Sequence, residues 1–272
     1  MTACAGTVTD VCLYEGLGPG YDKTRRADPT IAARLYEFLD LRPGQTCLDI
    51  ACGTGNYAIA LSRLGLAVSG VDASPSMIRQ AQSKAPRLSW RIADATSLPF
   101  PDRSQAGAIL VLALHHMADV LPDVFAEAYR VLDGGRFCIF TADPAQIRSY
   151  WLRRYFPDLI ERSATEMPDV RTVTDLLRAA GFPHVATAPY QVAPDVADLF
   201  LYAGKHRPWL YLRPDVRAGI SSFAKSDPRE LEAGIAHLRE DIANGNMAEA
   251  FAQAPGSPYP GDYTFVLARK TS

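Results

Sequence analysis

A single segment, in which a strand runs into a glycine-containing turn and then a helix, restricts the possible folds of this chain more than any other. It spans residues 48–56 and reads LDIACGTGN. Glycine in such a turn lets the backbone approach a ligand closely, and the free N–H groups at the start of a helix favour an anionic group. The segment therefore predicts a site for a nucleotide-type ligand at the end of a strand.

Short β-like runs alternate with helical patterns on both sides of this segment. Strands are predicted at residues 46–50, 67–71, 108–113 and 136–141, with a weaker one at 88–92. The helices between them have recognisable ends, because Ser74 can cap a helix that starts at Pro75 and Gly65 can end the helical run 57–64. A helical face is also expected at 121–132. This alternation predicts a parallel, doubly wound α/β sheet of the Rossmann-like kind.

The rest of the chain is expected to add helices and one strand to this sheet. Residues 29–41 and 173–180 are predicted as helices, and residues 263–268 as a last, antiparallel strand. The stretch 194–260 is too long for a plain connection, so we expect lid helices there; one apolar face would hold Leu231, Ile235, Leu238 and Ile242. The expected organisation is a cap or flap at 1–45, a cofactor-binding core at 46–193, a lid insertion at 194–260 and the last core strand at 261–272.

Composition argues against several classes of partner. Lys plus Arg number 28 and Asp plus Glu 30, so the net charge of −2 offers no broad field for nucleic acid. The apolar runs are too short for a membrane span, and no leader pattern begins the sequence, so we expect a cytoplasmic protein. The five cysteines lack CxxC spacing, which indicates reduced thiols and no metal site; they are Cys4, Cys12, Cys47, Cys52 and Cys138.

Acidic residues follow the first three strands in order. The pattern Asp-x-x-x-Gly-x-Gly, with Asp72 closing the second strand and Asp94 following the third, resembles class I S-adenosylmethionine-dependent methyltransferases. Four sequence segments are similar in particular to the methyltransferase type 11 group, which includes the ubiquinone and menaquinone biosynthesis C-methyltransferases. They are LDIACGTGNY, GVDASPSM, ADATSLPF and RVLDGG. The specific part of the resemblance covers residues 46–141.

The resemblance implies transfer of a methyl group from S-adenosylmethionine to a small molecule, with S-adenosylhomocysteine as product. It implies that Gly53 and Gly55 lie along the cofactor, that Asp49 lies near its amino group and that Asp72 binds the ribose hydroxyls. A carboxylate at the end of the second strand is also well suited to that role on chemical grounds, since it accepts two hydroxyl hydrogen bonds at the carboxyl edge of the sheet.

The other implied cofactor contacts come from the same motifs. Met77 is implied against adenine and Asp94 near the adenine amino group. The remaining motif residues expected at the cofactor are Ala51, Asn56, Ala73, Ala95 and Leu112. The family usually has glycine at position 51, so here the turn must tolerate a Cβ atom.

Candidate residues for catalysis and for covering the cofactor lie outside these motifs. His115 and His116 follow the fourth strand, and either imidazole is a candidate base, with packing of the cofactor wall as the alternative. The segment that holds Tyr21, Arg25 and Arg26 resembles the one that folds over the cofactor in such enzymes. Tyr21 is a candidate for covering the sulfonium, and an arginine of the segment, with Arg26 selected, is a candidate for holding the cofactor carboxylate. Aromatic and basic residues at 150–156 and 200–213 are expected mostly to pack the lid, with a minority lining the acceptor pocket.

The sequence leaves other functions open. Ala51 and the lack of an unmistakable catalytic residue are compatible with a protein that binds the cofactor without turnover. A nicotinamide-dependent oxidoreductase would share the sheet, but the GxGxxG spacing is missing because Asn-Tyr-Ala follows Gly55. The cysteine spacing resembles no arsenic methyltransferase motif closely. The acceptor atom (O, N or C) and the choice between monomer and homodimer also stay open.

Overall fold

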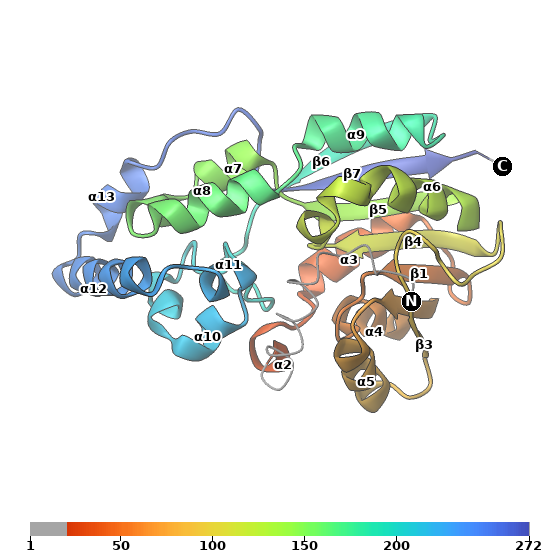
Figure 1. The fold of residues 1–272 in the computed structure, drawn as a ribbon, viewed down its shortest axis with the longest axis horizontal. Coiled ribbons are helices and arrows are strands. Elements are labelled where there is room, and N and C mark those ends of the chain that lie inside the picture. The colour runs from red at the N-terminus through yellow and green to blue at the C-terminus, as the bar shows by residue number, and fades with distance from the viewer. Residues whose placement is uncertain (1–20, 272) are drawn as a thin grey trace.

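A computed structural model describes residues 21–271, without the side chain of Tyr21. Its centre is a seven-stranded sheet in the order β3-β2-β1-β4-β5-β7-β6 (Figure 1). The strands are β1 Thr46–Ile50, β2 Ala67–Asp72, β3 Ser89–Ile92, β4 Gln105–Val111, β5 Leu132–Thr141, β6 His184–Tyr190 and β7 Tyr263–Lys270. β1 to β5 run parallel, and β7 is antiparallel to both β5 and β6. The predicted doubly wound sheet with an antiparallel last strand is confirmed.

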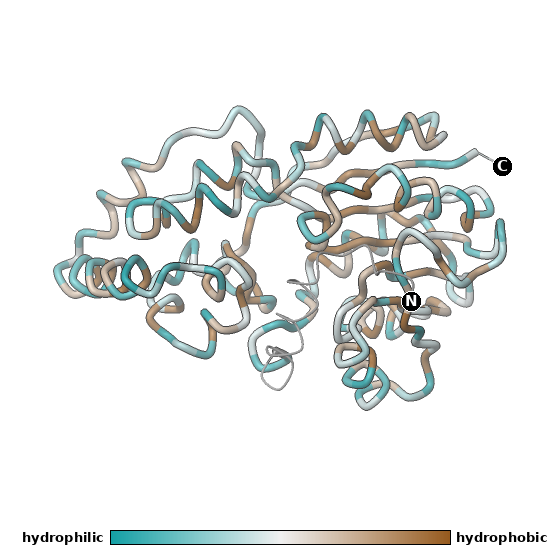
Figure 2. The backbone as a smooth tube through the Cα atoms, viewed as in Figure 1, coloured by the Kyte–Doolittle hydropathy of each residue, from teal (hydrophilic) through white to brown (hydrophobic). Residues whose placement is uncertain are grey.

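Helices cover both faces of the sheet (Figure 1). One face carries α3 Pro29–Leu39, α4 Asn56–Arg63 and α5 Pro75–Lys84, and the other carries α6 Leu121–Val131 and α9 Val170–Ala179. The central strands are buried between these layers, which explains their almost continuous apolar sequence (Figure 2). Chain order reverses between β1 and β4, which is where open α/β sheets bind ligands.

Side chains and glycines end these helices as the sequence indicates. The Ser74 hydroxyl accepts a hydrogen bond from the Met77 N–H and caps α5, which starts at Pro75. Asp28 caps α3 by accepting from two backbone N–H groups. Gly65, at φ +98°, follows the end of α4, where a left-handed residue lets the chain turn towards β2.

The remaining helices gather in a second, helical lobe beside the sheet (Figure 1). They are α7 Pro144–Arg148, α8 Pro157–Glu166, α10 Pro214–Ala218, α11 Ser221–Ala224, α12 Pro228–Asn244 and α13 Met247–Ala252. Within the predicted lid stretch, α12 carries the expected apolar face, with Leu238 fully buried and its three partners packed against the core. α7 and α8 come from the connection between β5 and β6, and α8 packs against α11. Among the described residues, no helix is long and apolar enough to cross a membrane.

Several element boundaries differ from the sequence predictions. The fourth strand spans 105–111 and not 108–113. It ends before Leu112 because that residue adopts φ +55°, which does not continue a strand. Leu132, expected on the helical face of α6, instead begins β5. The sequence analysis missed β6 entirely: this edge strand contains Pro189 and has mostly exposed or half-exposed side chains.

Candidate functional site

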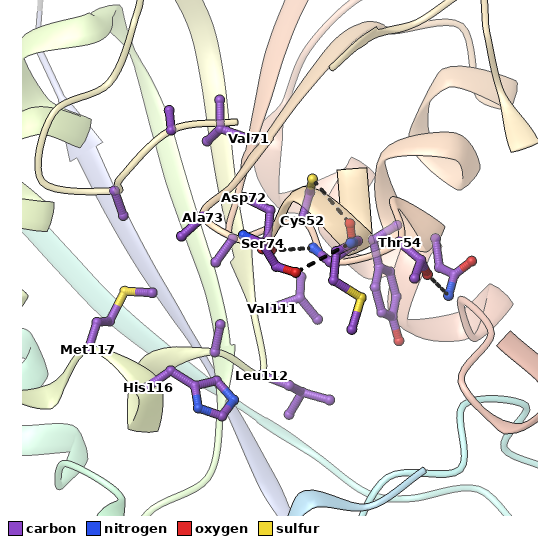
Figure 3. Close-up of a pocket in the computed structure, with 18 of the residues that line it drawn as sticks. Cys52, Thr54, Val71, Asp72, Ala73, Ser74, Val111, Leu112, His116 and Met117 are labelled. Carbon is purple, nitrogen blue, oxygen red and sulfur yellow. Dashed lines mark hydrogen bonds between the residues drawn. The ribbon is translucent and has the colours of Figure 1, made fainter. Parts of the chain in front are cut away.

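A cavity of about 190 Å³ opens at the carboxyl ends of the central strands, beside the point where strand order reverses (Figure 3). The predicted site residues that line it are Ala51, Gly53, Asn56, Asp72, Ala73, Met77, Asp94, Ala95, Leu112 and His116. Residues of the 150–156 and 200–213 stretches do not line it. Apart from the exposed Trp209, their aromatic side chains are buried in the core, where the Tyr150 and Tyr202 rings stack at 3.8 Å between centroids.

The two glycines of the turn after β1 face in different directions. Gly53, at φ +54°, has no heavy atom within 4 Å of the position that a Cβ would take, and it lines the cavity. A Cβ on Gly55, at φ +78°, would lie 2.3 Å from the indole of Trp90, and Gly55 does not line the cavity. Ala51 also has a positive φ, +56°, although it carries a Cβ. The turn therefore opens towards a ligand at Gly53 and packs on the core at Gly55.

Asp72 ends β2 and is held by two backbone donors. The N–H of Gly53 donates to its Oδ2 at 2.8 Å, and the N–H of Ser74 donates to its Oδ1 at 2.9 Å (Figure 3). Burial raises the pKa of Asp72, and these two hydrogen bonds oppose the rise. Each oxygen keeps a lone pair for a further donor, so the carboxylate can accept a pair of hydroxyl groups from a ligand in the cavity.

The other two acidic residues have different surroundings. Asp49 is buried and does not line the cavity; its Oδ2 accepts from the N–H of Ala58 at 3.1 Å and so ties β1 to α4. Burial raises the pKa of Asp49 to about 8. Asp94 does line the cavity, and its Oδ1 accepts from both the N–H and the hydroxyl of Thr96. Asp94 is thus oriented by Thr96 in the wall of the cavity.

His115 and His116 lie on a short 3-10 turn, Leu114–His116, directly after β4. Their rings are 3.7 Å apart between centroids. Only His116 lines the cavity; Figure 3 shows it beside Leu112 and apart from Asp72. Leu112 sits in the left-handed region at φ +55°, a strained conformation of the kind that concentrates at functional sites.

The short helix α2, Tyr21–Thr24, is fastened to the turn after β1. Asp22 Oδ1 accepts from the Thr54 hydroxyl at 2.6 Å, from Asn56 Nδ2 at 3.1 Å and from Lys84 Nζ at 2.8 Å. The segment that follows α2 contributes Arg25 to the cavity wall. The sequence-predicted Arg26 is exposed and does not line the cavity. The side chain of Tyr21, the residues before it and two of the cysteines lie outside the described residues.

The structure also brings residues to the cavity that the sequence analysis did not select. These are mainly Cys52, Thr54, Tyr57, Ser74, Met117, Val120, Val124 and Asp198. Several of them lie inside the motif segments and could have been predicted from their position there. Asp198 had no such signal, because it lies outside every motif segment, the nearest of which ends at Gly135. Among the described residues, no group of three or more His, Cys, Asp or Glu could hold a metal ion.

The residues present fit an adenosyl cofactor. The carboxylate of Asp72, at the end of β2, can accept hydrogen bonds from ribose hydroxyl groups. Ala73, Met77 and Ala95 give the cavity small apolar side chains for a flat ring, and the open side of Gly53 leaves room along the backbone. The residues that would hold adenosine are therefore those of the β2, β3 and β4 ends.

Comparison with known proteins points in the same direction. Residues 47–135 match the family model described as a methyltransferase domain. A demethylmenaquinone methyltransferase of Tropheryma whipplei is 31% identical over 163 residues, which is 56% of this chain and 67% of that protein. Phosphoethanolamine N-methyltransferase 1 of Zea mays is 28% identical over 91% of this chain and 46% of its own length. The crystal structure of a putative methyltransferase from an antibiotic biosynthesis pathway of Anabaena variabilis is 33% identical, with a TM-score of 0.81 over 90% of this chain and 98% of that one.

Proposed function

This chain belongs to the class I S-adenosylmethionine-dependent methyltransferases, and from that premise we propose that its acceptor is a mostly apolar small molecule without a phosphate or carboxylate group. The enzyme transfers the methyl group of S-adenosylmethionine to a small molecule and releases S-adenosylhomocysteine. The nicotinamide-dependent alternative and the binder without turnover are set aside by the family.

The charges that line the cavity carry the proposal. Among the described lining residues, Asp72, Asp94 and Asp198 stand against a single guanidinium, that of Arg25, and no lysine. An acceptor with its own anionic group would meet like charge at short range in a partly desolvated space. Most of the remaining wall is apolar, including Met117 and two valines of the α6 region. A neutral, apolar acceptor suits this lining better than a phosphate ester such as phosphoethanolamine.

The residue roles that we propose follow from these positions. Asp72 accepts the ribose hydroxyls, Asp94 accepts from the adenine amino group, and Met77 packs against the adenine ring. Gly53 lets the cofactor approach the backbone of the turn. Asp49 acts indirectly, by holding the start of α4 beside the turn.

Methyl transfer requires alignment, closeness and exclusion of water. The bound cofactor supplies an electrophilic methyl group on a sulfonium centre. The protein's share is to hold the acceptor atom in line with that methyl group, and proximity and orientation contribute roughly 7–11 kcal/mol to such reactions. His116 is our candidate for accepting a proton at a ring nitrogen when the acceptor is a carbon or hydroxyl group, because it lines the cavity. The ring of His115 lies 3.7 Å from that of His116 but outside the cavity lining.

We also propose the wider setting of this activity. The core is taken as 46–193 with its last strand at 261–272, flanked by the 1–45 cap and the 194–260 lid, with α7 and α8 contributed to the same lobe by the core's own connection. We propose a cytoplasmic enzyme that acts as a monomer or homodimer and without nucleic acid. The net charge of −2 supports the last point.

The experiment that tests the acceptor class uses methyl-labelled S-adenosylmethionine and purified enzyme. A short-chain hydroquinone, a hydrophobic phenol and phosphoethanolamine are offered separately, and labelled product is measured by mass. We expect label in one of the apolar acceptors and none in phosphoethanolamine. Efficient labelling of phosphoethanolamine alone would contradict the proposed acceptor class.

The His116→Ala variant is expected to bind S-adenosylhomocysteine like the wild type while kcat for a hydroxyl or carbon acceptor falls roughly 100-fold or more.

A further inference from the structure

One carboxylate in the wall of the cavity comes from outside the sheet motifs. Asp198 lies in the connection between β6 and the helices of the lobe, its side chain is 2% exposed, and it lines the cavity. A buried charge is stable only when it is paired and hydrogen-bonded. The partners of Asp198 therefore indicate what it does.

Both oxygens of Asp198 have a donor. Arg25 Nε donates to Oδ1 at 2.6 Å, and the Tyr57 hydroxyl donates to Oδ2 at 3.1 Å. Burial raises the pKa of Asp198, and the charge of Arg25 together with these hydrogen bonds opposes the rise. The carboxylate is thus fixed between the segment before α3 and the first turn of α4, and it fixes the guanidinium in return.

The backbone around Arg25 is held from two sides. Asn56 Nδ2 donates to the carbonyl oxygen of Arg25 at 2.7 Å, and the N–H of Leu199 donates to the carbonyl oxygen of Thr24 at 2.9 Å. Arg25 consequently lies over the start of α4, in the wall of the cavity. The N-cap of that helix is Gly55, which has no side chain to offer to the first N–H groups.

We propose that Asp198 is a positioning residue that orients Arg25 to bind the carboxylate of the cofactor's amino-acid part. The inference rests on the proposed placement of the cofactor. A guanidinium has five N–H donors in a rigid fork. Asp198 faces the edge formed by Nε and Nη2, with Nη2 3.5 Å from Oδ2, and Nη1 lies 3.5 Å from the carbonyl oxygen of Gly219. These contacts orient the fork, whose outer edge of Nη1 and Nη2 has the geometry that pairs with a carboxylate. The helix start beneath it adds favourable partial charge for the same group.

Preorganisation is the physical reason for the pair. An arginine that must be ordered during binding loses rotamer entropy, and Asp198 removes that cost by ordering the side chain beforehand. Asp198 belongs to the connection that leads into the lobe. A shift of that connection would therefore move Arg25 and change the affinity for the cofactor. Arg26, the next residue, is exposed and has no comparable position.

The test compares two ligands that differ in one group. Binding of S-adenosylhomocysteine and of its decarboxylated analogue is measured by calorimetry on the full chain, for the wild type and for Arg25→Met, Asp198→Asn and Tyr57→Phe. We expect Arg25→Met to weaken S-adenosylhomocysteine roughly 10- to 100-fold and Asp198→Asn about tenfold, with the decarboxylated analogue nearly unaffected. Tyr57→Phe should give a smaller selective loss. Asp215→Asn, which removes an exposed partner of Arg213, is the matched control and should change neither affinity.

Coupling between the two residues gives the decisive comparison. In an Arg25→Met background, Asp198→Asn should cause no further loss for S-adenosylhomocysteine, because there is no guanidinium left to orient. The double variant also removes both charges together, so it avoids leaving one buried charge unpaired if a single variant does not fold. Equal weakening of both ligands by Asp198→Asn, or additive losses in the double variant, would overturn the inference. A folded wild type that does not bind S-adenosylhomocysteine would instead refute the proposed cofactor site itself.

Discussion

At the scale of single residues, the two glycines of the turn after β1 have different roles, although both belong to one motif. Gly53 faces the cavity, and Gly55 makes room for the ring of Trp90. The sequence analysis expected both along the cofactor, since spacing alone does not tell which side of a turn a residue presents. The distinction leads to opposite phenotypes for the same substitution.

We predict that Gly55→Ala lowers the free energy of unfolding by roughly 2–4 kcal/mol, through its left-handed φ and the clash with Trp90. Gly53→Ala should cost only about 1–2 kcal/mol, because its Cβ meets no atom, but it should weaken S-adenosylhomocysteine at least about tenfold. Gly44→Ala is a matched control, since Gly44 also has a positive φ and open space but lies away from the cavity. Denaturant unfolding and calorimetry measure the two effects. A Gly53→Ala variant with wild-type affinity would contradict the assignment.

Asp49 makes stability depend on pH. Its folded pKa of about 8 lies above the ordinary value of 3.8, so the folded protein holds this proton more tightly than the unfolded chain. Its contribution to stability is therefore complete below about pH 4 and is lost as the pH rises towards 8. Asp49→Asn keeps an acceptor for the N–H of Ala58 but cannot ionise. We predict that its free energy of unfolding falls less than that of the wild type between about pH 5 and about pH 9. Parallel pH profiles for the two proteins in urea titrations would count against this reading.

At the scale of elements, the short helix α2 is held by side-chain hydrogen bonds that no local sequence pattern predicts. Asp22 accepts hydrogen bonds from Thr54 and Asn56, at the turn that leads into α4, and from Lys84 at the end of α5. The Lys84 ion pair is about a third exposed, so its contribution to global stability is small. Its importance lies in holding α2 against the turn after β1, directly before Arg25 in the cavity wall.

We predict that Asp22→Ala accelerates dissociation of S-adenosylhomocysteine about fivefold or more, while the melting temperature changes little. Stopped-flow displacement measures the rate. Asp133→Ala, which breaks the exposed pair with Arg103, serves as the control and should leave the rate unchanged. An unchanged dissociation rate in Asp22→Ala would mean that α2 does not gate the cavity.

Most of the sheet could be predicted because its signals are local. Strands buried on both faces read as continuous apolar runs, and Ser74 with Pro75 and Gly65 mark helix ends within one turn of themselves. β6 escaped because an exposed edge strand has neither the apolar run nor a clean alternation. The origin of α7 and α8 was equally hidden, since nothing local says that they pack with helices from residue 208 onwards. Whether a segment forms a helix or a strand can thus be predicted from its local sequence, whereas the helices that pack together in the lobe cannot.

At the scale of the whole molecule, the lobe and one face of the sheet share a single buried core. That core runs from Leu35 and Tyr57 on α3 and α4, through Phe140 on β5, to Tyr202 and Phe223 in the lobe. Aromatic contacts continue it, with the rings of Phe140 and Tyr263 stacked at 5.3 Å. The motif residues of the cavity were predictable from their resemblance to a family. The pairing of Arg25 with Asp198 was not, because only the folded chain brings residues 173 positions apart into contact.

The proposed function depends above all on one cavity binding an adenosyl ligand through the carboxylate of Asp72. The most direct measurement is a calorimetric titration of S-adenosylhomocysteine into the wild type and into Asp72→Asn, with reduced nicotinamide dinucleotide as a second ligand. We predict saturable binding by the wild type, at least about tenfold weaker binding by a folded Asp72→Asn, and no binding of the dinucleotide. Equal affinity of both proteins for S-adenosylhomocysteine, or none in the folded wild type, would contradict it.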